Sequence, residues 1–159
     1  MTYIDLPTVA RGLATIGIAG ITILGRESAP IAYAGGAEGM NFVVFRRDPE
    51  EALMGVCAVH RMFEAPAWLA VVTTATYHEV IDGVDSGSYD ALSAVVVDRH
   101  GHEASVAVRY TLTDGGRIAT GEPSYTGCGF NEGRIEGTVS DSLRAAWRRL
   151  VAIEQADVN

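Results

Sequence analysis

The sequence has 159 residues, 48% of them hydrophobic, which suits a single domain over residues 1–159 with its own core and excludes a disordered chain. Its formal net charge of -8 would repel a phosphate backbone, so no nucleic-acid partner is expected. All twelve basic residues are arginine, which excludes a catalytic lysine.

The first 24 residues are predicted to form two short elements. Residues 6–13 fit a short helix. Residues 16–24 fit a buried strand better than a helix, because glycine and β-branched residues both lower helix propensity.

An apolar run over residues 13–24, followed by Ala-Tyr-Ala at 32–34, imitates a secretory signal and its cleavage site. Asp5, the single arginine before the run and the long charged spacer after it are atypical of such a signal. The run is also too short to cross a bilayer. We therefore expect a cytoplasmic protein without a membrane partner.

Residues 31–40 are predicted to be a strand end that runs into a glycine-rich loop. Backbone amides of such a loop can hold an anion, and a simple connector is the alternative, since neither a P-loop nor a dinucleotide-binding fingerprint is present. Further strands are expected at residues 41–46, 54–59 and 68–74, with a turn at 48–51.

The two cysteines, Cys57 and Cys128, are far apart and belong to no metal-binding spacing, which favours a reducing compartment. Cys57 lies in an apolar run and is expected to be buried. Cys128 lies between glycines in a predicted loop, where it is either reactive or an ordinary loop residue.

The stretch from His78 to Tyr89 gathers three carboxylates, two glycines and a tyrosine directly before a predicted strand. Gly83 and Gly87 permit a tight loop from which Asp82 or Asp85 projects toward a ligand. The alternative is a solvated acidic turn, because Asp, Gly and Ser favour turns for local reasons.

The clearest hairpin of the sequence has its arms at residues 91–97 and 103–112. His100 and His102 at its tip have no obvious third ligand, so no metal site is predicted. The glycine-rich run over residues 117–137 suggests a binding loop or a mobile lid.

The chain closes with a predicted helix over residues 139–155, preceded by a Thr-x-x-Asp start at Thr138 and Asp141. One face of this helix is apolar and is expected to pack against a sheet. That face consists of Val139, Leu143, Trp147, Leu150 and Val151. Arg144, Arg148 and Arg149 lie mainly outside this face and are expected to be solvated.

These elements predict an α+β fold that is mostly β, with a small, partly closed barrel and a few flanking helices. No internal repeat or linker divides the chain.

The order of motifs resembles the γ-glutamylcyclotransferase family. The segment Asp82-Gly-Val-Asp-Ser-Gly-Ser-Tyr89 before a strand is similar to the family's Glu-Gly, short loop and Tyr. A hairpin ending at Tyr110, then Glu122-Pro-Ser124, then a helix ending Leu150-Val-Ala-Ile-Glu154 follow in the family's order. The resemblance covers residues 30–155 and implies a cyclotransferase-like barrel.

The resemblance also implies a reaction, in which the α-amine of a γ-glutamyl compound attacks its own γ-carbonyl and releases an amine and 5-oxoproline. Asp82 would be the general acid and base of this amide cleavage. No cofactor and no metal are implied. The substrate-binding residues would be Tyr33, Ala34, Gly35, Gly36, Ala37, Tyr89 and Tyr125.

Two departures from the family concern the site itself. Asp82 stands where the family has a glutamate, which is one methylene longer, and the segment 34–37 lacks the polar side chains of the family's substrate loop. Two hypotheses follow: a divergent enzyme acting on a small γ-glutamyl or amide-bearing metabolite, and a non-catalytic small-molecule binding or interaction protein on the same fold. Either is compatible with a homodimer.

Overall fold

A computed structural model describes residues 4–112, 118–120, 124–126 and 138–158. Its elements follow in the order α1 (Leu6–Leu24), β1 (Ile31–Gly36), β2 (Gly39–Val44), α2 (Pro49–His60), β3 (Trp68–Ile81), β4 (Val84–Asp98), β5 (Glu103–Leu112), β6 (Ile118–Thr120), β7 (Ser124–Thr126) and α3 (Thr138–Val158).

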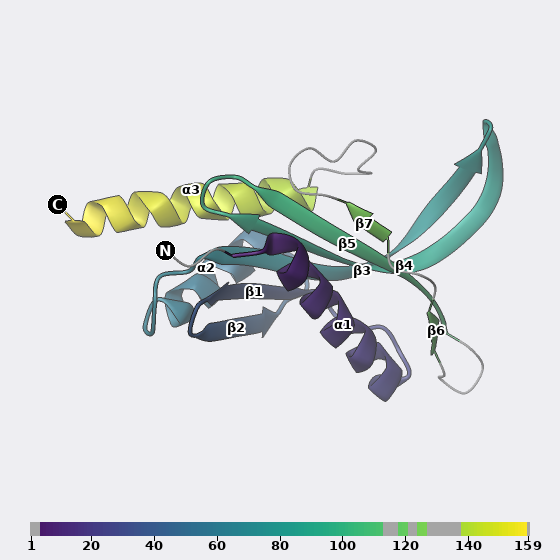
Figure 1. The fold of residues 1–159 in the computed structure, drawn as a ribbon, viewed down its shortest axis with the longest axis horizontal. Coiled ribbons are helices and arrows are strands. Elements are labelled where there is room, and N and C mark those ends of the chain that lie inside the picture. Colours follow the sequence, from purple (N-terminus) through teal and green to yellow (C-terminus); the bar gives the residue numbers. More distant parts are fainter. Residues whose placement is uncertain (1–3, 113–117, 121–123, 127–137, 159) are drawn as a thin grey trace.

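The strands form one antiparallel sheet in the order β2-β1-β3-β4-β5-β6, and β7 also pairs with β5. The five longer strands curl into a half-barrel, with the helices packed on it (Figure 1). The predicted α+β class and the incomplete barrel are therefore confirmed at this level.

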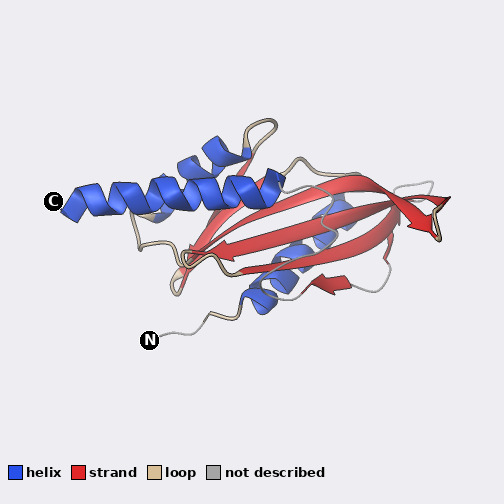
Figure 2. Cartoon of the chain, turned by 90° about the horizontal axis from the view of Figure 1, so that it is seen from above, coloured by secondary structure: helices blue, strands red, loops and turns tan. Residues whose placement is uncertain are grey.

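Helices cover both faces of the sheet (Figure 2). Alternation along β4 directs Leu92, Ala94 and Val96 into the core beneath α1. Val97 points the other way, into the core that α2 and α3 share with the sheet. The two cores make this domain a three-layer structure, helix on sheet on helices.

The N-terminal prediction of a short helix followed by a strand is wrong, because α1 runs unbroken from Leu6 to Leu24. Gly17 permits the helix to approach the sheet, since a Cβ there would lie 2.5 Å from Leu92 Cδ1. The helix ends at Gly25, which has a left-handed φ of 66°. Its buried face repeats with helical spacing: Leu6, Ala10, Leu13, Ala14 and Ile21.

By length and composition, α1 is apolar enough to cross a membrane. The apolar run over residues 13–24 is part of this longer helix, so it is not too short to span a bilayer. A core helix of a water-soluble domain passes the same test, and α1 packs one face on the sheet while Ile16, Ile23 and Leu24 are exposed. Length and hydropathy fit both environments, and the cytoplasmic location stays a prediction.

The strand predicted at residues 54–59 is also wrong, because this segment lies within α2. The preceding residues, predicted as a turn, begin the helix. Asp48 Oδ1 accepts a hydrogen bond from the Glu51 amide at 3.2 Å, and Pro49 occupies the first turn. Tertiary packing then buries the helix through Leu53, Val56 and Cys57, and Cys57 is buried as predicted.

Other elements match their predictions closely. The hairpin of β4 and β5 and the first half of β3 appear as expected, and the strand predicted at residues 41–46 is β2. Helix α3 buries Leu143, Trp147 and Leu150 on the predicted face.

Candidate functional site

The acidic stretch at residues 78–89 is a β-hairpin rather than a ligand loop. Asp82 and Gly83, with φ values of 51° and 78°, form the turn between β3 and β4. Both are exposed, as is Asp85. The hairpin projects beyond the rest of the sheet (Figure 1). Asp82 and Asp85 therefore lie in a solvated turn, which is the second of the two interpretations of this stretch.

Tyr89 belongs to the same hairpin. Its ring stacks on Tyr77 with centroids 5.6 Å apart, and the Arg109 guanidinium carbon lies 3.6 Å from its ring centroid. Arg109 also pairs with Glu79 at 3.1 Å. These contacts brace the hairpin at its base.

Asp82 is not brought near the glycine-rich segment. Gly35 lies opposite Trp68, the first residue of β3, whereas Asp82 follows the last. The 14 residues of β3 separate them, about 45 Å of extended strand at roughly 3.3 Å per residue. A ligand held at residues 34–37 could not reach the Asp82 carboxylate.

Gly35 and Gly36 are explained by close packing. A Cβ on Gly35 would lie 2.1 Å from Trp68 Cζ2, and one on Gly36 would lie 2.6 Å from Glu64 Oε1. Both residues lie in β1, and Ala37 and Glu38 make the turn to β2. The predicted loop is thus a tight hairpin.

The anion held by this turn is the chain's own. The Glu38 amide donates to the Glu64 carboxylate at 3.0 and 3.2 Å, the type of amide–anion contact predicted for this segment. Glu64 Oε1 also lies 3.1 Å from His60 Nε2, and His60 Nδ1 lies 2.9 Å from Asn41 Oδ1. This chain of polar contacts ties α2 to the β1–β2 hairpin, and no local sequence pattern indicated it.

The remaining predicted site residues are placed as follows. Tyr33 and Ala34 are buried in the two cores, and burial raises the pKa of Tyr33. The backbone of Tyr125 lies in β7, opposite Val106. Cys128 and most of the 117–137 segment lie outside the described residues.

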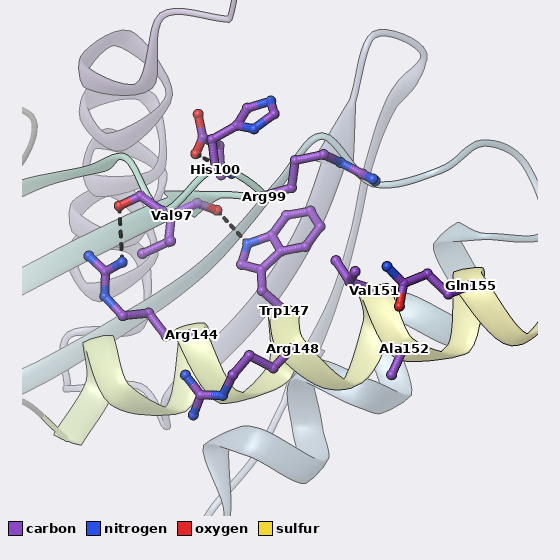
Figure 3. A pocket seen from close by; sticks show the side chains of 11 residues that line it. Val97, Arg99, His100, Arg144, Trp147, Arg148, Val151, Ala152 and Gln155 are labelled. Carbon is purple, nitrogen blue, oxygen red and sulfur yellow. Dashed lines mark hydrogen bonds between the residues drawn. The ribbon is translucent and has the colours of Figure 1, made fainter.

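A groove of about 420 Å³ lies elsewhere, between α3 and the connection from β4 to β5 (Figure 3). Its walls combine apolar and cationic side chains. It is lined by Val97, Asp98, Arg99, His100, Gly101, Arg144, Trp147, Arg148, Val151, Ala152 and Gln155.

Trp147 forms the apolar centre of this groove. Its indole N–H donates to the Val97 carbonyl at 2.8 Å, which fixes the ring against the end of β4 (Figure 3). The Arg99 guanidinium carbon lies 5.3 Å from the ring centroid. A cation over an indole face is an attractive arrangement, so both side chains are held in place.

Two of the arginines in the groove already have acidic partners. Arg99 makes two hydrogen bonds to Glu154, at 3.0 and 3.3 Å. Arg144 donates to the Gly101 carbonyl at 3.0 Å and lies 3.7 Å from the buried carboxylate of Glu103. Their charges are therefore largely compensated within the chain.

Arg148 differs from them. It is exposed, and it forms no ion pair with any of the described residues. Its neighbour Arg149 points to α2 instead and pairs with Glu50 and Glu51. The groove thus offers one uncompensated guanidinium beside an apolar wall.

The carboxylate of Asp98 is used by the turn at the mouth of the groove. Its Oδ1 accepts hydrogen bonds from the amides of His100 and His102, both at 2.9 Å, and its Oδ2 lies 3.0 Å from His102 Nδ1. Across the described part of the chain, no group of three or more His, Cys, Asp or Glu side chains is arranged to hold a metal ion.

Sequence reasoning assigned the arginines of α3 to solvent and so missed this groove. The available signal was three arginines within six residues around a tryptophan, at positions 144–149. Comparison with known proteins finds no matching family profile, characterised protein or solved structure, so no family is assigned.

Proposed function

We propose that the protein is a non-catalytic binding protein for a small anionic metabolite, held in the groove between α3 and the β4–β5 connection. The observation that carries this proposal is Arg148, an exposed guanidinium without an acidic partner among the described residues, one helical turn before the apolar side chains of Val151 and Ala152 on α3. The groove volume of about 420 Å³ suits a metabolite-sized ligand.

The ligand chemistry follows from the lining. A carboxylate or phosphate would pair with Arg148, since guanidinium geometry matches both groups. An apolar or aromatic portion would lie along Val151 and Ala152, over the nearly buried ring of Trp147. We therefore expect ligands that join an anionic group to a small ring or alkyl chain.

Placement of the acidic groups favours this binding hypothesis over the cyclotransferase hypothesis. General acid–base catalysis requires a carboxylate within hydrogen-bonding reach of the substrate. Asp82 is exposed at a hairpin tip, and Asp98 is held by three contacts of its own turn. On this proposal, incubation with γ-glutamyl amines releases no 5-oxoproline.

The test is equilibrium binding of a panel that contains benzoate, phenyl phosphate, octanoate and the uncharged control benzamide, followed by isothermal titration. Loss of one charge-assisted contact costs about 1.5 kcal/mol, so Arg148→Ala should weaken the tightest anion roughly tenfold or more. Arg149→Ala is the matched control, because it removes the adjacent arginine outside the groove. Equal affinities for the two variants, or binding of benzamide as tight as benzoate, would contradict the proposal.

A further inference from the structure

Strand β2 is an edge strand of the sheet and exposes apolar side chains. It pairs with β1 on one side, and no described strand pairs with its other side (Figure 1). Met40, Phe42 and Val44 are exposed by 43%, 64% and 54%. An exposed apolar edge strand is a template for pairing with another strand. The open edge of β2 therefore suggests that another strand pairs with it.

The hydrogen-bonding phase of this edge is fixed. The Phe45 amide donates to the Pro30 carbonyl at 2.9 Å, in the same register that places Val44 opposite Ile31. Bonding alternates along an antiparallel pair, so every second residue of β2 bonds to β1. The amides and carbonyls of Met40, Phe42 and Val44 therefore point to the open side.

The same three side chains share one face. Phe42 lies opposite Tyr33, with ring centroids 6.0 Å apart, and Tyr33 belongs to the core on the α1 side. Helix α1 packs mainly over β3, β4 and β5 and leaves this end of the sheet face open.

Charge is distributed unequally along the edge. Glu38 precedes β2, and Arg46 and Arg47 follow it; all three are exposed. None of the three forms an ion pair with a described side chain. One end of the strand is acidic and the other basic, with apolar residues between them.

We propose that the occupant of this edge is a second copy of the chain, paired β2 to β2 in antiparallel orientation about a two-fold axis. An antiparallel copy places the acidic end of one strand beside the basic end of the other, so the charge pattern complements itself. A sheet continuous across both copies results.

The hydrogen-bonding phase selects the register. Residues with outward amides must face one another, so even-numbered residues pair with even-numbered residues. Phe42 opposite Phe42 of the second copy satisfies this rule, places Met40 opposite Val44, and brings the turn that carries Glu38 beside the bend that carries Arg46. A shift of two residues in either direction keeps even-numbered residues paired, but it no longer brings Glu38 beside Arg46.

The first test is the mass of the full chain in solution, measured by light scattering across a concentration series. We expect twice the 16.9 kDa mass of the chain at high concentration. Phe42→Glu, which places two carboxylates together on the two-fold axis, should return the mass to that of a monomer. Circular dichroism verifies folding, and Val84→Glu, the same kind of change at an exposed position on the distant β3–β4 hairpin, provides the control.

Charge reversal then tests the register. Glu38→Arg alone and Arg46→Glu alone should each raise the dimer dissociation constant severalfold, because like charges then face each other. A mixture of these two variants should form a heterodimer tighter than either homodimer. A heterodimer no tighter than the homodimers would overturn the register.

Cysteine crosslinking provides an independent measurement. In a Cys128→Ser background, Phe42→Cys should form an intermolecular disulfide on mild oxidation, since Cα atoms of a hydrogen-bonded pair are about 5.5 Å apart. Val44→Cys should not, because residue 44 faces residue 40 of the second copy. A monomeric parent protein, or a dimer that Phe42→Glu leaves intact, would overturn the proposal.

Discussion

At the scale of single residues, Gly35 is required by the packing of Trp68. Gly35→Ala would place its Cβ 2.1 Å from the Trp68 ring, and Trp68 is only 6% exposed. Overpacking of this kind typically costs about 1–3 kcal/mol, and we expect that loss in urea unfolding. Gly55→Ala is the matched control, since nothing lies within 4 Å of its Cβ position in α2 and the change should stabilise the helix. Equal effects of the two substitutions would contradict this role for Gly35.

Cys57 carries a pH prediction. Burial raises the pKa of its thiol from 9.0 to about 12. Above pH 9 the unfolded chain loses this proton more readily than the folded chain, so the contribution to stability is complete below pH 9 and is lost as the pH rises toward 12. The slope is at most about 1.4 kcal/mol per pH unit. Cys57→Ala should flatten the fall of unfolding free energy between pH 9 and 11, and an unchanged slope would contradict the burial argument.

Burial of single side chains was predicted correctly where the residue belongs to a local apolar pattern. Cys57 and Trp147 are buried because each lies in a recognisably apolar run or stripe. Gly35 and Gly36 were misinterpreted, because composition does not distinguish a glycine that frees a loop from one that admits Trp68 or Glu64. That distinction depends on a partner about 30 residues away in the sequence, which no local pattern contains.

At the scale of elements, local propensity misled twice. The glycines and isoleucines of α1 have low helix propensity and favoured a strand. Burial of an apolar face with helical spacing against the sheet stabilises the helix instead. In α2, Asp48-Pro49 was interpreted as a turn, although the same residues make an N-cap and a first helical position. In contrast, the β4–β5 hairpin and α3 have patterns that agree with their packing, and both were predicted.

The hairpin of β3 and β4 carries an element-scale prediction. Between Asp90 and the turn at Asp82 and Gly83, β3 and β4 pair only with each other among the described residues. A two-stranded ribbon of this kind is only marginally stable by itself. Gly83→Val would force a β-branched residue into a φ of 78° and should cost about 1 kcal/mol or more locally. Amide exchange should then accelerate in residues 76–89 and not in β5. Asp82→Asn is the control, because asparagine tolerates this conformation; acceleration in the core as well would contradict a locally independent hairpin.

At the scale of the whole molecule, the sheet order and the covering of both faces arise from contacts between distant segments. Pairing of β1 with β3 across α2, and of α3 with both α2 and the sheet, has no signature in any single window of sequence. The α+β class follows from the element count, whereas the groove depends on where α3 crosses the end of β4. No local sequence pattern reveals this crossing, so the groove that Arg148 lines was not predicted. The position of Asp82 at an exposed turn likewise depends on how β3 and β4 pair.

Anion binding in the groove lined by Trp147 can be followed through the two tryptophan indole N–H signals in a nitrogen–proton correlation spectrum. The titrant is phenyl phosphate. The Trp147 signal should shift saturably, while the signal of Trp68, which packs against Gly35, should stay unchanged. The Trp147 shift should be lost in Arg148→Ala and kept in Arg149→Ala. A Trp147 signal that does not move with phenyl phosphate, or that moves equally in Arg148→Ala, would contradict anion binding in this groove.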